Sequence, residues 1–361
     1  MAVADVDTPA LLVDLDALEA NIAKMAAALR GSAVRLRPHA KAHKCPEIAR
    51  RQMAAGAVGV CCQKPSETEA MVAAGVPDVL IANEVVGAPK LARVAALAQR
   101  ARVAICVDDG GNAAELERAA SQAAVRLDVL VEVDVGARRC GVEPAQALKL
   151  ARLVSGFEHL RFCGLQAYHG SAQHVRSIGD RRDAVARSCE RVREARDRIL
   201  ESGLPCETVT GAGTGTFVFE LESGIYTEIQ PGSYVFMDAD YGQNAWEGLP
   251  RFEQSLHVWT TVMSVASARD RVVVDAGLKA HSVDSGMPLV ADRPDLRYTR
   301  ASDEHGVIEG DGSHAMPRLG DKLRLVPGHC DPTVNLHDWI VCVREGTVEA
   351  VWPISARGAL L

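Results

Sequence analysis

The sequence predicts an α/β fold in which a (β/α)8 barrel of the TIM type is followed by an antiparallel β domain. Short β-prone runs alternate with helical stretches through the first two thirds of the chain, and after about residue 241 mainly alternating β segments remain. We therefore expect residues 20–240 to form the barrel, and residues 1–19 and 241–361 to form the β-rich domain.

The barrel strands are expected at eight β-prone runs: residues 35–41, 59–62, 79–83, 103–108, 127–134, 162–168, 208–213 and 226–230. The fifth run carries apolar side chains on both faces, which is typical of a parallel strand covered by helices. A doubly wound open sheet is the alternative, but no Gly-x-Gly-x-x-Gly pattern follows the first run, as a dinucleotide-binding fold would normally require. The barrel is the preferred interpretation.

Helical segments separate these runs. The expected helices cover residues 46–55, 66–74, 89–100, 113–123, 144–154 and 181–202. In the second domain, β segments are expected at residues 255–267, 271–275, 322–327, 339–344 and 347–353. Residues 8–15 are also strand-like and precede the first helical stretch, so we place them in the second domain.

Composition excludes several classes of protein. Hydrophobic residues make up 48% of the chain and charged residues 24%, as in ordinary globular proteins. The formal charge is -7 and no basic run is present, so we expect no nucleic-acid partner. The ten cysteines include no Cys-x-x-Cys pair, which favours reduced core residues and the cytoplasm. No uncharged apolar run reaches the about 18 residues that span a bilayer, so we expect no membrane segment. As a separate expectation, the protein forms a homodimer.

The first predicted strand carries a candidate nucleophile. A period of two places Arg37, His39, Lys41 and His43 on one face of this strand. Lys41 lies near the C-terminal end, where barrel active sites are built, and cationic neighbours would disfavour its ammonium form, as a Schiff-base lysine requires. The alternative is a charged edge strand at the surface.

Two glycine-containing turns follow the seventh and eighth predicted strands. Residues 210–216 read Thr-Gly-Ala-Gly-Thr-Gly-Thr, and residues 231–234 read Pro-Gly-Ser-Tyr. Barrels commonly bind phosphate with the loops at these two places, because glycine frees backbone N–H groups to point at an anion. Taken alone, a glycine-rich turn is more often a plain loop.

A candidate metal motif lies in the second domain. His329 and Asp331 alternate with Cys330, so an extended backbone would direct the imidazole and the carboxylate the same way. A nitrogen and oxygen pair suits Mn²⁺, Mg²⁺ or Co²⁺ at least as well as Zn²⁺, whereas a Cys330 thiolate would favour Zn²⁺. The alternative is a turn whose aspartate caps its own backbone.

Three further residues stand near predicted strand ends. Tyr168 ends the sixth run, His174 follows shortly after it, and Arg139 follows the fifth. The arginine could fix a phenolate oxygen, or it could pair with neighbouring carboxylates. The histidine could equally be an ordinary loop residue.

Taken together, these motifs resemble the pyridoxal-phosphate enzymes of the alanine-racemase-like fold. Within them the chain resembles the group of D-threonine aldolase, D-serine dehydratase and 3-hydroxyaspartate aldolase, from Asp7-Thr-Pro to Ile354-Ser-Ala-Arg-Gly. The segment Arg-Pro-His-Ala-Lys-Ala-His-Lys at residues 37–44 is similar to the family's cofactor-lysine strand, and Cys-Gln-Lys-Pro-Ser-Glu at residues 62–67 is similar to its second-strand segment.

The resemblance implies roles for single residues. It makes Lys41 the Schiff-base lysine and places Gln63 beside pyridoxal phosphate. Arg139 matches the arginine that meets the O3′ oxygen, and Tyr168 matches a tyrosine that lines the ring. The phosphate cradle would comprise Gly213, Thr214, Gly232 and Ser233, with Thr214 as its main side-chain donor.

The metal motif bears on the reaction. In the dehydratases it tends to read His-x-Cys and holds zinc, whereas His329 and Asp331 give the His-x-Asp form of the aldolases. The resemblance implies retro-aldol cleavage of D-3-hydroxy-amino acids to glycine and an aldehyde, with Mn²⁺ as the first candidate metal and His174 as the proton acceptor. A 3-hydroxyaspartate aldolase, a dehydratase and a non-catalytic carrier of the cofactor remain alternatives.

Overall fold

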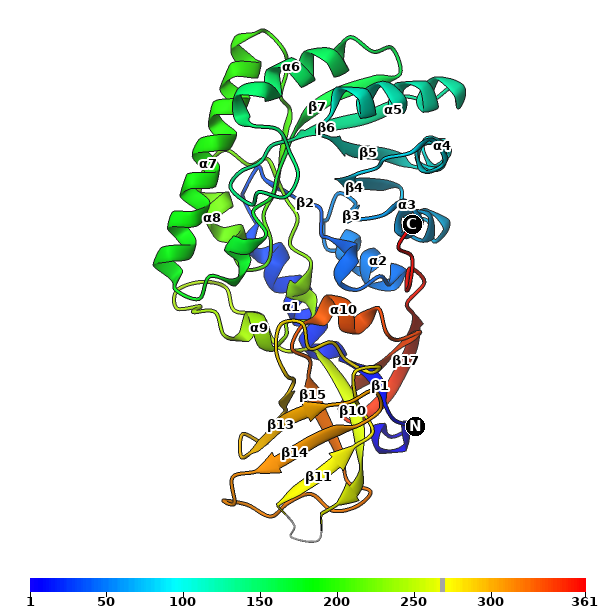
Figure 1. The fold of residues 1–361 in the computed structure, drawn as a ribbon, viewed down its shortest axis with the longest axis vertical. Coiled ribbons are helices and arrows are strands. Elements are labelled where there is room, and N and C mark those ends of the chain that lie inside the picture. Colours follow the sequence, from blue (N-terminus) through cyan, green and yellow to red (C-terminus); the bar gives the residue numbers. More distant parts are fainter. Residues whose placement is uncertain (267–269) are drawn as a thin grey trace.

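The computed structural model describes residues 1–266 and 270–361, and it confirms the predicted fold class (Figure 1). Eight parallel strands form one sheet, in the order β2-β9-β8-β7-β6-β5-β4-β3, and nine strands form the other. The barrel occupies the upper part of the molecule in Figure 1 and the nine-stranded sheet the lower part.

Each barrel strand begins close to where the hydrophobic pattern places it. The strands are β2 (Arg35–Leu36), β3 (Val60–Cys62), β4 (Asp78–Glu84), β5 (Arg102–Val107), β6 (Leu127–Glu132), β7 (Leu160–Ala167), β8 (Thr208–Gly211) and β9 (Glu228–Ile229). Between β2 and β3 the ring is completed by a parallel bridge from His39 to Cys61. The Cys61 N–H donates to the Pro38 carbonyl across this seam at 2.8 Å.

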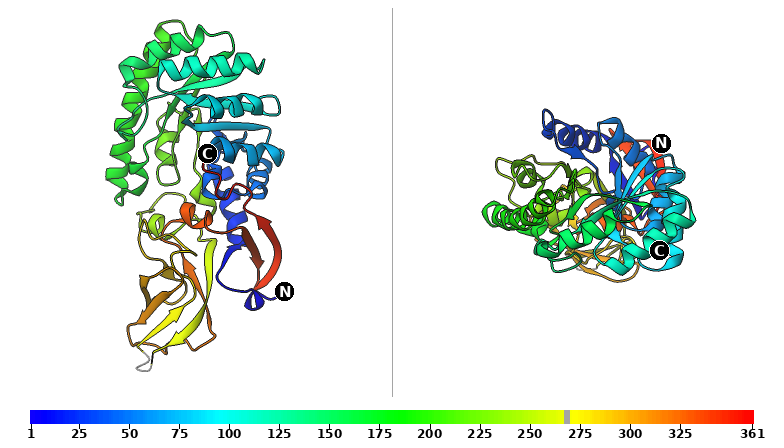
Figure 2. Two further views of the ribbon diagram at one scale, coloured as in Figure 1. Left: turned by 45° about the vertical axis from the view of Figure 1, so that its right-hand side comes forward. Right: turned by 90° about the horizontal axis from the view of Figure 1, so that it is seen from above.

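The helices surround the barrel, as the right-hand view of Figure 2 shows from above. They are α1 (Leu15–Ala28), α2 (Pro46–Ala54), α3 (Pro65–Ala73), α4 (Ala88–Leu97), α5 (Gly110–Gln122), α6 (Pro144–Ser155), α7 (Ile178–Glu201) and α8 (Phe217–Glu222). Proline stands in the first turn of α2, α3, α4 and α6, where its missing N–H costs nothing.

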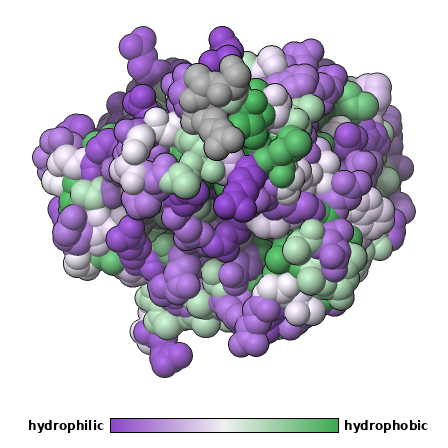
Figure 3. All heavy atoms as spheres, turned by 90° about the horizontal axis from the view of Figure 1, so that it is seen from below, coloured by the Kyte–Doolittle hydropathy of each residue, from purple (hydrophilic) through white to green (hydrophobic). Residues whose placement is uncertain are grey.

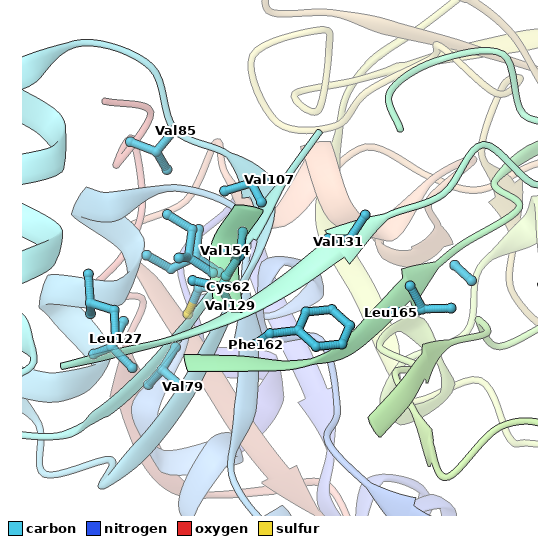
Figure 4. Packing of buried hydrophobic residues seen from close by; sticks show 14 of the residues in the cluster. Cys62, Val79, Val85, Val107, Leu127, Val129, Val131, Val154, Phe162 and Leu165 are labelled. Atoms are coloured by element: carbon cyan, nitrogen blue, oxygen red, sulfur yellow. The ribbon is translucent and has the colours of Figure 1, made fainter. Parts of the chain in front are cut away.

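Apolar side chains hold the helices to the strands. Residues such as Val79, Val129 and Val154 pack in one cluster between the two layers (Figure 4). The inside of the barrel is filled by a separate set of mostly small side chains: Cys61, Leu80, Ala82, Cys106, Leu130 and Cys163. All ten cysteines are free thiols, as their scatter through apolar segments predicts.

The first predicted strand is much shorter than expected. Residues 35–41 were expected to be extended, but β2 ends at Leu36, and Ala40–Ala42 form a 3-10 turn, η2. Pro38 cannot donate to a strand ladder, and the His39 ring accepts the Lys41 N–H at 3.4 Å, which starts the turn. Alternating basic residues imitate a strand here, so the prediction for the end of this segment is wrong.

The nine-stranded sheet has the order β11-β14-β13-β12-β15-β10-β1-β16-β17. Its strands are β1 (Ala10–Asp14), β10 (Leu256–Val265), β11 (Arg271–Val274), β12 (Leu289–Val290), β13 (Leu296–Ala301), β14 (Gly306–Gly310), β15 (Lys322–Val326), β16 (Trp339–Arg344) and β17 (Thr347–Pro353). The opening strand β1 pairs antiparallel with β10 and parallel with β16. Sequence patterns missed β12, β13 and β14, and the predicted end of β10 at Ser267 lies outside the described residues.

The remaining helical elements are short. They are η1 (Val3–Asp5), η3 (Ser171–His174), η4 (Ser233–Val235), α9 (Ala239–Gly242) and α10 (Cys330–Val334). The Ala239 N–H donates to the Pro327 carbonyl at 3.0 Å, and the Asp240 N–H donates to the Gly328 carbonyl at 3.2 Å. These bonds hold the segment before α10 against the end of the barrel.

The lower end of the molecule is mainly polar. Figure 3, which views it from below, shows hydrophilic side chains over most of this face and separate apolar patches among them. Within residues 1–266 and 270–361, no helix combines the length and apolarity needed to cross a bilayer.

Candidate active site

A cavity of about 330 Å³ opens at the C-terminal ends of the barrel strands. All the predicted site residues line it: Lys41, Gln63, Arg139, Tyr168, His174, Gly213, Thr214, Gly232, Ser233, His329 and Asp331. Most come from loops after barrel strands, and the last two come from the segment between β15 and β16. The structure therefore brings together residues separated by up to 290 positions.

Lys41 lies in the η2 turn at the mouth of the first strand, with 38% of its side chain exposed. Its Nζ is 3.9 Å from Oδ2 of Asp331. Burial disfavours the ammonium form, but the Tyr168 phenol and the Asp331 carboxylate outweigh it, and the pKa of Lys41 is raised. The prediction that neighbouring cations disfavour the ammonium is therefore wrong.

The basic neighbours of Lys41 do not share its face. Arg37 is buried and donates to Glu228 at 2.9 Å and to Asp78 at 2.6 Å. His43 is fully buried, and its Nδ1 accepts the Cys45 N–H at 3.1 Å. Burial lowers the pKa of His43 to about 4, so this ring is neutral at pH 7. Only His39 stays beside Lys41 in the cavity.

His39 and Gln63 form a hydrogen-bonded pair on the cavity wall. Nε2 of His39 donates to Oε1 of Gln63 at 2.9 Å, which agrees with an Nδ1 that accepts the Lys41 N–H. Burial and the Lys41 charge lower the pKa of His39 to about 3, so it too is neutral. This neutral imidazole faces the cavity without adding charge next to the lysine.

The glycine-rich loops fit a phosphate group. Oγ1 of Thr214 is buried and has no hydrogen-bond partner in the described structure, so this hydroxyl lacks a group that a phosphate would supply. A Cβ atom at Gly213 would come within 2.5 Å of Gln173, and one at Gly232 within 2.7 Å of the His39 carbonyl. Close packing therefore requires glycine at both positions, and the orphaned hydroxyl indicates a ligand.

Arg139 and Tyr168 lie together on another wall of the cavity. The Arg139 guanidinium is 5.7 Å from the centre of the Tyr168 ring. Its Nη2 is 3.9 Å from Oε1 of Glu132, so the arginine faces the cavity and also pairs with a nearby carboxylate.

His329 and Asp331 reach the cavity in a different way from that predicted. The backbone is extended at His329 but not beyond it, because His329 is the N-cap of the short helix α10 and Asp331 lies in the first turn of this helix. The His329 Nδ1 and Oδ2 of Asp284 are 2.8 Å apart, which leaves Nε2 as the free ring nitrogen. Oδ1 of Asp331 accepts from Ser233 at 3.2 Å, so the predicted phosphate loop touches the predicted metal motif.

Nearby charges bias both of these side chains. Burial alone would raise the pKa of Asp331, but Lys41 and His329 lower it. Burial alone would lower the pKa of His329, but Asp331 and Asp284 raise it. One imidazole nitrogen and one ionised carboxylate therefore face the same space as Lys41, which is a donor set that suits a divalent cation.

His174 ends the η3 turn and lines the cavity. Its Nδ1 pairs with Oδ2 of Asp240, which also accepts from Arg176. The other ring nitrogen is left to exchange a proton with a molecule in the cavity. Such a pair of carboxylate and imidazole orients a proton acceptor.

Sequence reasoning missed Asp240 and Asp284. Each is one of 47 acidic residues, and each lies far along the chain from the histidine that it contacts. Asp284 lies in the loop between β11 and β12. Local patterns carry no signal for such partners, because the fold alone brings them together.

The fold and the lysine-centred cavity define a class: the chain belongs to the pyridoxal-phosphate enzymes of the alanine-racemase-like fold. Residues 13–240 match the family model "Alanine racemase, N-terminal domain". Residues 255–343 match the model "Putative serine dehydratase domain".

Within this class the chain is similar to aldolases. It is 52% identical to a D-threonine aldolase of Arthrobacter sp, over 98% of this chain and 94% of the relative. It is 48% identical to a 3-hydroxy-D-aspartate aldolase of Paracoccus denitrificans, over 98% and 93%. The crystal structure of D-threonine aldolase from Filomicrobium marinum superposes with a TM-score of 0.97 at 51% identity, covering 99% and 97% of the two chains. A D-threo-3-hydroxyaspartate dehydratase of Delftia sp. is more distant, at 30% identity over 95% and 96%.

Proposed function

We propose that this chain is a metal-dependent aldolase that cleaves D-3-hydroxy-amino acids, such as D-threonine, to glycine and an aldehyde. The observation that carries the proposal is the position of His329 and Asp331 in the same cavity as Lys41. A carbon–carbon lyase needs an electron sink and a means of removing the hydroxyl proton, and this cavity offers residues for both. The likeness to two aldolases of about 50% identity supports the same reaction class.

Lys41 would bind the cofactor through its amine, and Thr214 and the two glycine turns would hold its phosphate. When bound, pyridoxal phosphate supplies the sink for the electrons of the breaking Cα–Cβ bond. Arg139 would hold the phenolic oxygen of the cofactor, and Gln63 and Tyr168 would line its ring. The orphaned Thr214 hydroxyl supports this placement of the phosphate.

His329 and Asp331 hold a divalent metal, Mn²⁺ before Mg²⁺, Co²⁺ or Zn²⁺. Two protein ligands leave most of the coordination shell to water and substrate, so the metal exchanges readily. In this place it would act as a Lewis acid on the substrate hydroxyl. Asp284 fixes the ring of His329 through the contact of 2.8 Å, so that Nε2 faces the cavity.

His174 accepts the proton of the β-hydroxyl group. Asp240 holds the Nδ1 side of the ring, which leaves Nε2 as the atom that faces the substrate, and Arg176 pairs with the Asp240 carboxylate and keeps it in place. We also propose that the enzyme is a homodimer and that it acts in the cytoplasm. Light scattering after gel filtration tests the dimer, and cell fractionation tests the location.

The products distinguish this proposal from its alternatives. With D-threonine and Mn²⁺ we expect acetaldehyde and glycine in equal amounts, whereas a dehydratase would release ammonia and a 2-oxo acid. A faster rate with 3-hydroxy-D-aspartate, giving glyoxylate, would make that acid the preferred substrate. A protein that binds the cofactor but releases neither product from any D-3-hydroxy-amino acid would be a carrier, and the proposal would be wrong.

Chelation tests the metal separately. Exhaustive chelation should stop turnover, leave the cofactor absorbance in place and be reversed by Mn²⁺, because Lys41 and the phosphate loops do not depend on His329. Asp331→Asn should resist this rescue, since one imidazole alone holds a hard cation weakly. Full activity after chelation would contradict the metal-dependent form of the proposal.

A further inference from the structure

A second cluster of ligating side chains lies outside the cavity, at the same end of the barrel. Glu84 ends β4, Asp108 follows β5, and Cys140 lies in the loop between β6 and α6. One ligand atom of each lies within 4.8 Å of the others. Among the described residues this is the group of three that geometry alone selects for a metal, and none of its members lines the active-site cavity.

The cluster has more acidic groups than cations. Glu132, at the end of β6, has a side chain that is only 5% exposed and lies within hydrogen-bonding reach of Glu84. Its one ion-pairing partner in the described structure is Arg139, at 3.9 Å and half exposed. Oε1 of Glu84 is likewise buried without a hydrogen-bond partner in the described residues. Burial and the Glu84 charge raise the pKa of Glu132 to about 9, so this carboxyl group holds a proton at pH 7.

We propose that Glu84, Asp108 and Cys140 form a second divalent-metal site, distinct from the His329 centre, with Glu132 as an outer or fourth ligand. A thiolate among carboxylates favours Zn²⁺, which accepts sulfur and oxygen in a tetrahedral shell, over Mg²⁺ or Ca²⁺, which take oxygen. Ligand atoms that already lie within 4.8 Å of one another need only small movements to enclose such an ion.

Binding displaces protons. Burial and Glu84 raise the pKa of the Cys140 thiol to about 11, so the free cluster holds a thiol at pH 7. Zinc binds the thiolate, and the thiol proton therefore goes to solvent as the Zn–S bond forms. The proton that Glu132 holds is released in the same step if its carboxylate joins the shell. Zinc affinity should accordingly rise with pH.

The site would fix the loop that carries Arg139. Cys140 is the next residue along the chain, and Oδ2 of Asp108 already accepts the Gly141 N–H at 3.0 Å. An ion held by Glu84, Asp108 and Cys140 would join this loop to the ends of two barrel strands. By fixing this loop, the metal would thus keep Arg139 at the cavity wall.

Zinc stoichiometry of the holoenzyme tests the proposal. An Asp331→Asn background vacates the first site, and the protein is stripped with a chelator, dialysed against dilute Zn²⁺ and analysed for metal. We expect about one zinc ion per chain in this background and close to none when Cys140→Ser or Asp108→Asn is added. Cys206→Ser is the matched control, because Cys206 is also partly exposed but lies beside no carboxylate cluster, and it should keep the ion.

Co²⁺ gives a second, independent measurement. In the difference spectrum of the holoenzyme, a thiolate ligand produces a charge-transfer band that oxygen and nitrogen ligands do not produce. We expect this band in the wild type and in Cys206→Ser and Cys330→Ser, and its loss in Cys140→Ser with the circular dichroism unchanged. Equal zinc content with and without Cys140, or a band lost only in Cys330→Ser, would overturn the proposal.

Discussion

The two ends of strand β6 place carboxylates in opposite environments. Asp128, near the N-terminal end, is buried but accepts from Arg161 at 2.7 Å and from Arg102 at 2.9 Å, and these arginines lower its pKa against the effect of burial. Glu132, at the C-terminal end, has only Arg139 at 3.9 Å and a pKa raised to about 9, first by burial and then by Glu84. Four residues apart on one strand, the first is fully paired and the second is not.

The same contrast holds around the whole barrel. At the N-terminal ends, ion pairs link Arg37, Asp78, Arg102, Asp128, Arg161 and Glu228, and of their buried oxygens Oε2 of Glu228 alone has no hydrogen-bond partner among the described residues. At the C-terminal ends, the Thr214 hydroxyl and the Glu84 carboxylate have buried atoms without partners in the described residues. One end uses its polar groups to hold the fold, and the other keeps them available for ligands.

The largest effect should come from the ligand-binding end. Lys41→Ala should remove the yellow cofactor absorbance and lower kcat/KM by about four orders of magnitude or more, since a covalent anchor and catalyst is lost. Thermal stability of the cofactor-free protein should hardly change, because Lys41 is only partly buried. Lys90→Ala, on the exposed side of α4, is the control that should alter neither property.

A mutation at the N-terminal ends of the barrel strands, where the charges are paired, should lower stability and leave activity unchanged. Arg37→Leu leaves Glu228 buried without its partner at 2.9 Å, and the free energy of unfolding should fall by about 3–5 kcal/mol in urea titrations. Turnover per folded molecule should stay near the wild-type value, because Arg37 does not line the cavity. Arg35→Leu removes a more exposed pair at 3.5 Å and should cost less than about 1 kcal/mol. Equal losses from the two substitutions would contradict the distinction between them.

The orphaned hydroxyl should affect ligand binding more than stability. Thr214→Val should weaken the affinity for pyridoxal phosphate by roughly 10- to 100-fold, as expected when a hydrogen bond to a charged group is lost. Thr214→Ser should retain most of the affinity. Titration of the cofactor-free protein by fluorescence measures both, and an unchanged affinity in Thr214→Val would place the phosphate elsewhere.

The smallest change per step of the measurement is a pH dependence of stability. Glu220 is fully buried behind the phosphate loop, where Thr216 donates to it at 2.8 Å, and burial raises its pKa to about 7. Between the usual value of 4.5 and 7 the folded state holds a proton that the unfolded state has lost. Stability should therefore fall as pH rises through this window, by at most about 1.4 kcal/mol per pH unit.

The matched variants for this measurement lie on one helix. Glu220→Gln should flatten the curve of unfolding free energy against pH between 4.5 and 7. Glu222→Gln, whose side chain is 52% exposed, should leave the slope as it is. An unchanged slope in Glu220→Gln would mean that the carboxyl group is ionised in the fold.

The sequence predicts the barrel better than the second domain, for a physical reason. Strands such as Leu127–Glu132 are buried on both sides and are mainly apolar, apart from Asp128 and the terminal Glu132. In contrast, Leu296–Ala301 faces solvent on one side, with Arg297 and Arg300 among its residues, and resembles a polar loop. Gly306–Gly310 is short and bounded by glycines, so its pattern is equally weak.

For the site, the chain predicts the residues but not their environment. Lys41, Thr214 and His329 lie in motifs that can be recognised in the sequence. The carboxylates that shift their pKa values cannot be recognised in this way, because Asp331 contacts Lys41 only through the packing of the second domain on the barrel. For this reason the predicted direction of the pKa shift of Lys41 is wrong, although the sequence places Lys41 correctly in the cavity.

The position of β1 in the nine-stranded sheet affects how the protein folds while it is being synthesised. A ribosome releases Ala10–Asp14 first, yet the two strands that flank it, β10 and β16, emerge only after the whole barrel. The barrel can fold during synthesis, but both edges of β1 stay unpaired until β10 and β16 have been made. An unpaired strand of this kind is prone to pair with wrong partners. The segment that brings His329 and Asp331 to the cavity leaves the ribosome just before β16, so the pocket and the sheet beneath it are completed almost together.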